Sequence, residues 1–230
     1  MMYALTKSAC RKAWKPKPMK LPPRLYHLAE ETNWPSIRRH GLLSTTSLLN
    51  QAGLRGERRK RIERSRRLEH TEVSDGVYVR DHKPLPAEAL RRCLIRMTPA
   101  EWYALINSKV FFWLDTDRLN RQRGACEPRP QVVLEIDTAR LVARYADRIA
   151  LSPINTGNAR RQPAKRGRCT FVPYGAWVES EWSLEREGLR ALRSRQRCPP
   201  AELTIADAVP DIMSFVKCVY RLSPGEKLRR

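Results

Sequence analysis

The chain has 230 residues, 41% of them hydrophobic and 30% charged, which is long enough for one domain with a complete core. Its 45 Lys and Arg outnumber its 24 Asp and Glu, and the formal net charge of +21 favours a polyanionic partner such as nucleic acid or a phosphate-bearing molecule. No stretch of 18 apolar residues and no signal peptide pattern is present, so we expect a cytoplasmic protein without a membrane partner. Six cysteines stand singly without CxxC spacing, which argues against a zinc site or a disulfide framework.

The chain begins with a segment that differs in composition from the rest. Residues 1–23 contain six basic and no acidic residues and are interrupted by four prolines. This composition predicts an extended basic arm over residues 1–23, followed by a single folded domain over residues 24–223 and a basic tail over residues 224–230.

The first half of the domain alternates short strand and helix patterns. Asn33, followed by Pro35, predicts the N-cap and first turn of a helix that ends at Gly41. In chain order, the expected elements are a strand over 24–28, helices over 33–41, 45–52 and 56–68, a strand over 77–81, a helix from the capping box at 98–101, and a strand over 109–114. The last strand is apolar throughout, which predicts burial on both faces.

The second half has more strands, and they are shorter. In chain order, the expected elements are a helix over 115–119, a strand over 131–136, a helix over 137–146, a strand up to 151, a polar loop over 152–158, a basic loop over 159–168, a strand over 169–174, a helix from 176, and strands over 202–206 and 214–222. Short, turn-linked late strands indicate an α+β fold rather than a doubly wound sheet.

Standard catalytic motifs are missing from the sequence. It contains no Walker GxxxxGK[ST], GxGxxG, GxSxG or HExxH pattern. A metal-dependent nuclease needs clustered carboxylates, for which Asp81, Glu135 and Asp137 are the candidates. Asp137 is explained as a helix cap, and we expect no metal site.

One motif order is distinctive. Tyr26-His27 on the first strand is followed by NWPSI at 33–37 and HGLLS at 40–44. This order resembles the opening of ADP-ribosyltransferase domains, in particular the DarT-type toxins that modify DNA. The segments 110–121, 131–137 and 151–159 resemble the strand and helix that wall the NAD cleft, the next strand, and the polar loop of DarT. Residues 24–222 also resemble an uncharacterised bacterial family with the order YH…NWPSI…HGLLS…RDxKP…FFWL…SPIN.

The resemblance implies a fold, a substrate and partners. The fold is an ADP-ribosyltransferase-like split β-sheet with flanking helices, and the substrate is NAD. The acceptor is a base of DNA or RNA, and the protein acts as a toxin or phage-defence effector that an antitoxin protein can oppose. The residues implied at the NAD site are Tyr26, His27, Asn33, Ser44, Thr45, Arg80, Lys83, Phe112, Trp113, Asn155 and Thr156.

Each of these residues also has a purely structural explanation. His27 fits a strand histidine bonded to backbone, and Phe112 and Trp113 fit core positions. Arg80 and Lys83 fit a solvated charge cluster, although they also fit a pyrophosphate site. Asn155 and Thr156 precede Gly157 and fit turn chemistry. We expect the His27 strand and the 109–114 strand to border one cleft.

The catalytic acid is where the chain departs from the family pattern. ADP-ribosyltransferases use a glutamate on a late strand, which stabilises the positive charge of the transition state. In DarT-like order that strand is 169–174, where Thr170 stands, and Glu179 and Glu181 follow nearby. Either another acid serves, or the chemistry differs, or the site is inactive.

Basic residues gather in two segments of the domain. The candidates for nucleic-acid contact are Arg58, Arg59, Lys60, Arg61, Arg160, Arg161, Lys165, Arg166 and Arg168. Composition bias toward arginine is the alternative explanation. Two other functions stay open: a catalytically inactive nucleic-acid or nucleotide-binding module on the same fold, and an NAD glycohydrolase or protein-directed transferase.

Overall fold

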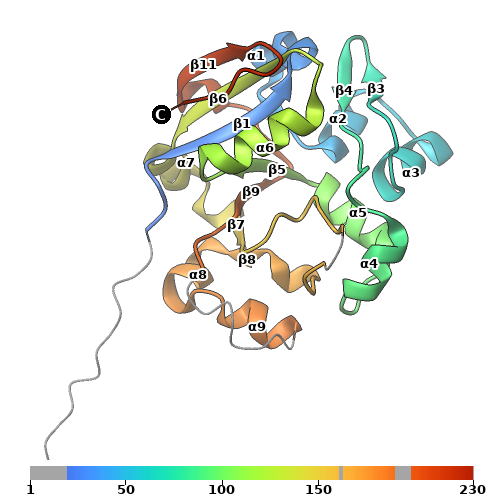
Figure 1. Ribbon diagram of the computed structural model, residues 1–230, viewed down its shortest axis with the longest axis vertical. Helices are drawn as coiled ribbons and strands as arrows, with labels where there is room; N and C mark the ends of the chain where they lie inside the picture. Colours follow the sequence, from blue (N-terminus) through green and yellow to red (C-terminus); the bar gives the residue numbers. More distant parts are fainter. Residues whose placement is uncertain (1–19, 161–162, 190–197, 230) are drawn as a thin grey trace, which may run out of the picture.

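The protein is described by a computed structural model that covers residues 20–160, 163–189 and 198–229. Most of the expected basic arm, residues 1–19, and the predicted nucleic-acid contact Arg161 lie outside these described residues. The described part forms an α+β domain around a seven-stranded antiparallel sheet (Figure 1). The predicted fold class is therefore confirmed.

The strands of the main sheet lie in the order β11–β6–β1–β5–β9–β7–β8, and every neighbouring pair is antiparallel. Two small ladders, β2–β10 and β3–β4, flank it. The strands are β1 (Arg24–Glu30), β2 (Leu42–Leu43), β3 (Thr71–Ser74), β4 (Val77–Val79), β5 (Lys109–Trp113), β6 (Gln131–Asp137), β7 (Ile149–Ser152), β8 (Val172–Pro173), β9 (Glu202–Ala206), β10 (Ala208–Val209) and β11 (Val216–Leu222).

Helices surround the sheet and begin where the sequence supplies caps. Ser44, Thr98, Asp115 and Asp137 each accept a bond from a backbone N–H of the first turn, as their residue types predict. The helices are α1 (Trp34–His40), α2 (Thr45–Gln51), α3 (Gly56–Arg64), α4 (Ala87–Cys93), α5 (Pro99–Asn107), α6 (Thr116–Cys126), α7 (Thr138–Tyr145), α8 (Tyr174–Ser180) and α9 (Ser183–Leu189).

The main sheet is split between β1 and β5. β1 pairs with β6 along its whole length, and β5 pairs in the same way with β9. β1 and β5, in contrast, share one register pair, Tyr26 opposite Trp113. The sheet therefore consists of two halves, β11–β6–β1 and β5–β9–β7–β8, whose facing edges diverge beyond that pair.

Hydrophobic clusters cover both faces of the sheet. Phe112 packs into the cluster that contains Trp177 of α8, whereas its neighbour Phe111 packs against the cluster that contains Trp102 of α5. Successive side chains of a strand point to opposite faces, so these two contacts show that β5 is covered on both sides. The burial predicted from its apolar run is confirmed.

A glycine brings α1 close to the C-terminal part of the chain. Gly41 ends α1 with φ of 76°, a conformation that favours glycine, and a Cβ at this position would lie 2.4 Å from the carbonyl oxygen of Val209. Only glycine therefore lets β2 and β10 pair directly after the helix. This contact builds one rim of the site described below.

Candidate functional site

A cavity of about 340 Å³ lies where the two half-sheets diverge. This volume is within the range of small-molecule sites. β1 forms one wall and β5 forms the wall opposite to it. The polar and charged residues along it are His27, Glu30, Asn33, Ser36, Ser44, Thr45, Arg67, Tyr78, Arg80, Asp81, His82, Asn107, Lys109, Gln122, Asn155, Thr156 and Glu202.

His27 lies in the gap between β1 and β5. Its Nδ1 is 2.8 Å from the carbonyl oxygen of Phe111, and its ring centroid is 5.7 Å from that of Phe112. A carbonyl oxygen can only accept, so Nδ1 carries the proton and Nε2 keeps a lone pair. Burial lowers the pKa of His27 to about 4, which makes the ring neutral at pH 7. None of the described residues hydrogen-bonds to Nε2, so this atom is available to accept a bond from a ligand.

Glu202, at the first position of β9, is a buried acid of the cavity that sequence reasoning missed. It lines the cavity and lies opposite Trp113 on β5 and Ser152 on β7. Its carboxylate accepts hydrogen bonds from Thr156, through the backbone N–H and the side-chain hydroxyl. Burial raises the pKa of Glu202 to about 7 in spite of these bonds. A carboxylate at the start of a mostly apolar strand is the signal in the sequence that could have found it.

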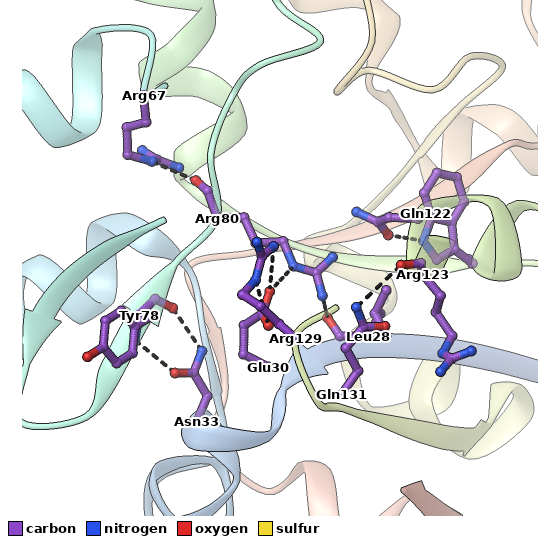
Figure 2. Close-up of polar contacts among 11 residues, drawn as sticks. Leu28, Glu30, Asn33, Arg67, Tyr78, Arg80, Gln122, Arg123, Arg129 and Gln131 are labelled. Atoms are coloured by element: carbon purple, nitrogen blue, oxygen red, sulfur yellow. Dashed lines mark hydrogen bonds and ion pairs between the residues drawn. The ribbon is translucent and has the colours of Figure 1, made fainter. Parts of the chain in front are cut away.

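Asn33 attaches the β3–β4 hairpin to the rim of the cavity. Its side-chain amide pairs with the backbone of Tyr78 through two bonds of 2.8 Å, one donated and one accepted (Figure 2). Asn33 was predicted to cap α1 with its side chain, and that prediction is wrong, because the side chain makes no capping bond. The amide instead pairs with the backbone of the hairpin as a neighbouring strand would. It thereby fixes one wall of the cavity.

Two arginines converge on a buried acid at the far end of β1. Glu30 is 3% exposed and receives Arg80 at 3.4 Å and Arg129 at 3.2 Å (Figure 2). Arg80 also donates to the carbonyl of Leu28. Arg80 therefore lines the cavity, where it shares the single negative charge of Glu30 with Arg129.

Arg67, which sequence reasoning did not single out, is buried and contacts the backbone of Arg80 (Figure 2). Its guanidinium donates to the carbonyl of Arg80, the side chain of Asn107 and Nε2 of His82. Burial lowers the pKa of Arg67 to about 10, so it stays charged at neutral pH. The side chain thus holds the segment after β4 against α5.

The predicted NAD-site residues divide into those that reach the cavity and those that do not. His27, Asn33, Ser44, Thr45, Arg80, Trp113, Asn155 and Thr156 line it. Three others do not. Tyr26 packs with Trp113 in a separate cluster, Phe112 lies in the core beside His27, and Lys83 is exposed outside the cavity. Phe111, next to Phe112 on β5, lines the cavity in its place.

The three predicted catalytic residues after residue 169 lie away from the cavity. Thr170 lies in a 3₁₀ turn, Arg168–Thr170, because β8 is only two residues long, and its buried hydroxyl accepts a bond from Gly167. Glu179 is exposed on α8, and Glu181 follows the end of that helix. None of the three lines the cavity, whereas Glu202 on the central strand β9 does.

The basic segments lie on either side of α5. Arg58, Lys60, Arg61, Arg160, Lys165 and Arg168 are exposed, and Arg59 is paired with Glu63. Arg64 and Arg168, one from each segment, both contribute to the lowered pKa of Glu101 at the start of α5, after the hydrogen bonds from Thr98. The prediction that Arg166 contacts nucleic acid is wrong, because its side chain is 2% exposed.

Within the described residues, no group of three or more His, Cys, Asp or Glu side chains is arranged to hold a metal ion. In the same part of the chain, no helix combines the length and the apolar character that crossing a membrane requires.

The fold and site define an α+β domain whose split sheet opens into a polar cleft. A model for a family of unknown function, DUF7002, matches residues 23–216, and the chain belongs to this family. Among solved structures, Thermosipho africanus DarTG in complex with ADP-ribose is similar at 12% sequence identity with a TM-score of 0.46, over 87% of this chain and 44% of that one. The chain thus spans less than half the length of that protein. A search of curated proteins finds no match.

Proposed function

We propose that this protein is an NAD-consuming ADP-ribosyltransferase that modifies nucleic acid and acts as a toxin or phage-defence effector. The observation that supports this most is the presence of two groups along one cleft: a neutral imidazole with an available acceptor nitrogen and a buried carboxylate. The sequence order around Tyr26 and His27, which resembles ADP-ribosyltransferases, supports the same proposal.

His27 is proposed to bind the substrate. Its Nε2 accepts a hydrogen bond from a ribose hydroxyl of NAD, while the bond from Nδ1 to Phe111 keeps the ring in one orientation. Because the ring is already fixed in this way, it loses little conformational entropy when the ligand binds. The neutral state at pH 7 matters, because an imidazolium would donate from both nitrogens and would place a positive charge beside the cationic nicotinamide.

Glu202 is proposed to act on the reacting ribose. The bond between ribose carbon and nicotinamide nitrogen breaks, its electron pair leaves with nicotinamide, and a new bond forms to a nucleophilic atom of the acceptor base. Positive charge develops on the ribose during this exchange, and a preorganised carboxylate in a buried site stabilises that charge. Glu202 thus takes the role for which Thr170, Glu179 and Glu181 were first considered.

The basic surface supports nucleic acid as the acceptor. The exposed arginines of α3 come just before Arg67, and those at 160–168 come just after residues 155–157. Arg67 and residues 155–157 line the cavity, so both basic segments connect directly to its rim. Phosphates bound there would bring a base of the same strand toward the cleft. An antitoxin that covers this surface would block the acceptor.

The proposal is tested by incubating the protein with labelled NAD, alone and with DNA, RNA or cell protein. We expect nicotinamide release and label transfer to nucleic acid. Glu202→Gln should reduce the rate by about 100-fold or more, in line with the loss of one electrostatic group from a preorganised site. Glu88→Gln, which removes an exposed acid on α4, is the matched control and should keep full activity.

Three results would contradict the proposal or change it. Wild-type protein that consumes no NAD with any acceptor would exclude the transferase, and retained nucleic-acid binding would then indicate a binding module. Glu202→Gln with wild-type activity would remove Glu202 from the chemistry. NAD cleavage without transfer to nucleic acid would favour a glycohydrolase or, if protein is labelled, a protein-directed transferase.

A further inference from the structure

One residue of the loop after β7 makes the described hydrogen bonds to the Glu202 carboxylate. The backbone N–H of Thr156 is 3.1 Å from Oε1 and 3.2 Å from Oε2, and the Thr156 hydroxyl is 2.7 Å from Oε2. Thr156 is fully buried. It was predicted to contact NAD, but its hydroxyl is directed to Glu202 instead. The backbone donor orients both oxygens and the hydroxyl holds one of them.

Thr156 is in turn held by a buried arginine. Nη1 of Arg166 donates to the carbonyl of Thr156 at 3.2 Å, and the guanidinium lies over the ring of Trp102 at 5.6 Å. The backbone of Arg166 is fixed as well, since its N–H donates to Cys93 and its carbonyl accepts from Ile95. A side chain with this many contacts has few alternative positions. Its bond to the carbonyl of Thr156 therefore holds the backbone of Thr156 in place.

We propose that Thr156 is a positioning residue for the carboxylate of Glu202, and that Arg166 acts through Thr156 by securing the loop that carries it. The catalytic meaning of this inference rests on the function proposed above. The relay runs from a residue in the basic loop, through the polar loop, to the acid on β9. It gives Thr156 and Arg166 a role in the site that does not require them to touch NAD or nucleic acid.

The hydrogen bonds of Thr156 act against burial. Burial disfavours the ionised carboxylate, whereas both donors of Thr156 stabilise it. Two charged groups assist from other elements, Arg166 beside the loop and Arg118 on α6, and both favour ionisation of Glu202. Removal of the hydroxyl takes away the shortest of the three bonds, so a larger share of Glu202 becomes protonated at neutral pH.

The test measures the pKa of Glu202 without relying on enzymatic activity. The free energy of unfolding is measured by urea denaturation from pH 5 to pH 9 for wild type, Thr156→Val, Thr156→Ser and Glu202→Gln. Comparison with Glu202→Gln isolates the contribution of Glu202 to the pH dependence. We expect Thr156→Val, which keeps the shape of the side chain, to raise the pKa of Glu202 by about 1 to 2, because a bond to a charged group is lost. Thr156→Ser keeps the hydroxyl and should restore the wild-type value.

A second readout uses turnover. If the protein cleaves NAD, the acid limb of the kcat profile should move to higher pH in Thr156→Val by the same amount, with KM unchanged. At pH 7 the rate should fall about fivefold or more and recover at pH 9, since a rise of 1 from a pKa near 7 lowers the ionised fraction by that factor. A residue that only supports packing would lower the rate equally at every pH.

Each outcome bears on the relay. An unchanged pKa of Glu202 in folded Thr156→Val overturns it. If Thr156→Val does not fold, it is combined with Glu202→Gln. Recovery of folding in the double variant supports the relay, because no buried charge then remains to be stabilised, and failure to fold there indicates a packing role and overturns it. A shifted pKa in a protein that cleaves no NAD supports the relay and overturns only the proposed enzymatic function.

Discussion

Glu202→Gln should stabilise the protein at alkaline pH, although the same change should lower the rate of the proposed reaction about 100-fold or more. Burial raises the pKa of this carboxyl from its ordinary 4.5 to about 7. A shift of this size corresponds to a stability cost of about 3 kcal/mol for the ionised form, as an order of magnitude. Glutamine has nearly the same shape, carries no charge, and retains an oxygen that can accept from Thr156. The variant therefore keeps the packing and removes the buried charge.

The pH range in which Glu202→Gln is the more stable protein follows from the raised pKa of Glu202. The folded pKa lies above the unfolded one, so the contribution of Glu202 to wild-type stability is greatest below pH 4.5, falls between pH 4.5 and 7, and is constant above that range. Glu202→Gln should lack this decline. At pH 8 its unfolding midpoint should exceed that of wild type by about 6–12 °C, and at pH 4 the two should be similar.

Thermal unfolding followed by circular dichroism at pH 4, 6 and 8 measures this difference. The exposed Glu88→Gln serves as the control and should follow wild type at each pH. A Glu202→Gln protein that is less stable than wild type at pH 8, with the same pH dependence, would refute the reasoning. That result would mean that the ionised carboxylate and its bonds to Thr156 stabilise the fold more than burial of the charge costs.

Three further predictions concern the rest of the site. Asn33→Ala should lower the free energy of unfolding by about 1–3 kcal/mol, because two bonds to the backbone of Tyr78 are lost. Hydrogen exchange should then be faster in residues 71–79, and unchanged exchange there would show that Asn33 does not hold the hairpin in place. The contribution of His27 to the free energy of unfolding should fall as the pH drops from 6.5 toward 4, because the unfolded chain protonates His27 before the folded protein does, and urea titrations of His27→Gln should lack this component. Arg58→Ala combined with Arg61→Ala should lower the slope of log affinity for duplex DNA against log salt by about 2 if both contact phosphates, and an unchanged slope would remove α3 from the interface.

Much of the fold could be predicted because local signals decide it. Thr98 and Glu101 form a capping box that starts α5, and Asp115 and Asp137 cap α6 and α7 as expected. A cap depends on residues within one helical turn, so the sequence contains all the information. The strands at 109–114 and 131–136 could be predicted for a similar reason, since a short apolar run of that length is typical of a buried strand.

The site could be predicted only in part, because it depends on register and on long-range contacts. His27 was found through a motif next to it in the chain. Glu202 was missed, since its place in the cavity depends on its register opposite Trp113 and on a partner, Thr156, in another loop. Asn33 has the residue type of an N-cap, but the better partner for its amide is a hairpin 45 residues away. Such competition between local and distant partners cannot be decided from one segment.

The split sheet has a consequence for the synthesis of the protein. Its two halves interleave along the chain: β1 pairs with β6 and β6 with β11, while β5 pairs with β9 and β9 with β7. Neither half is a continuous stretch of sequence, so neither can be completed while the chain is partly made. His27 is translated early, with β1, whereas Glu202, which lies opposite Trp113, is translated late, with β9. Because pairings of such high sequence separation form late, the cleft is assembled only after almost the whole described domain has been translated, and unfinished chains do not contain it.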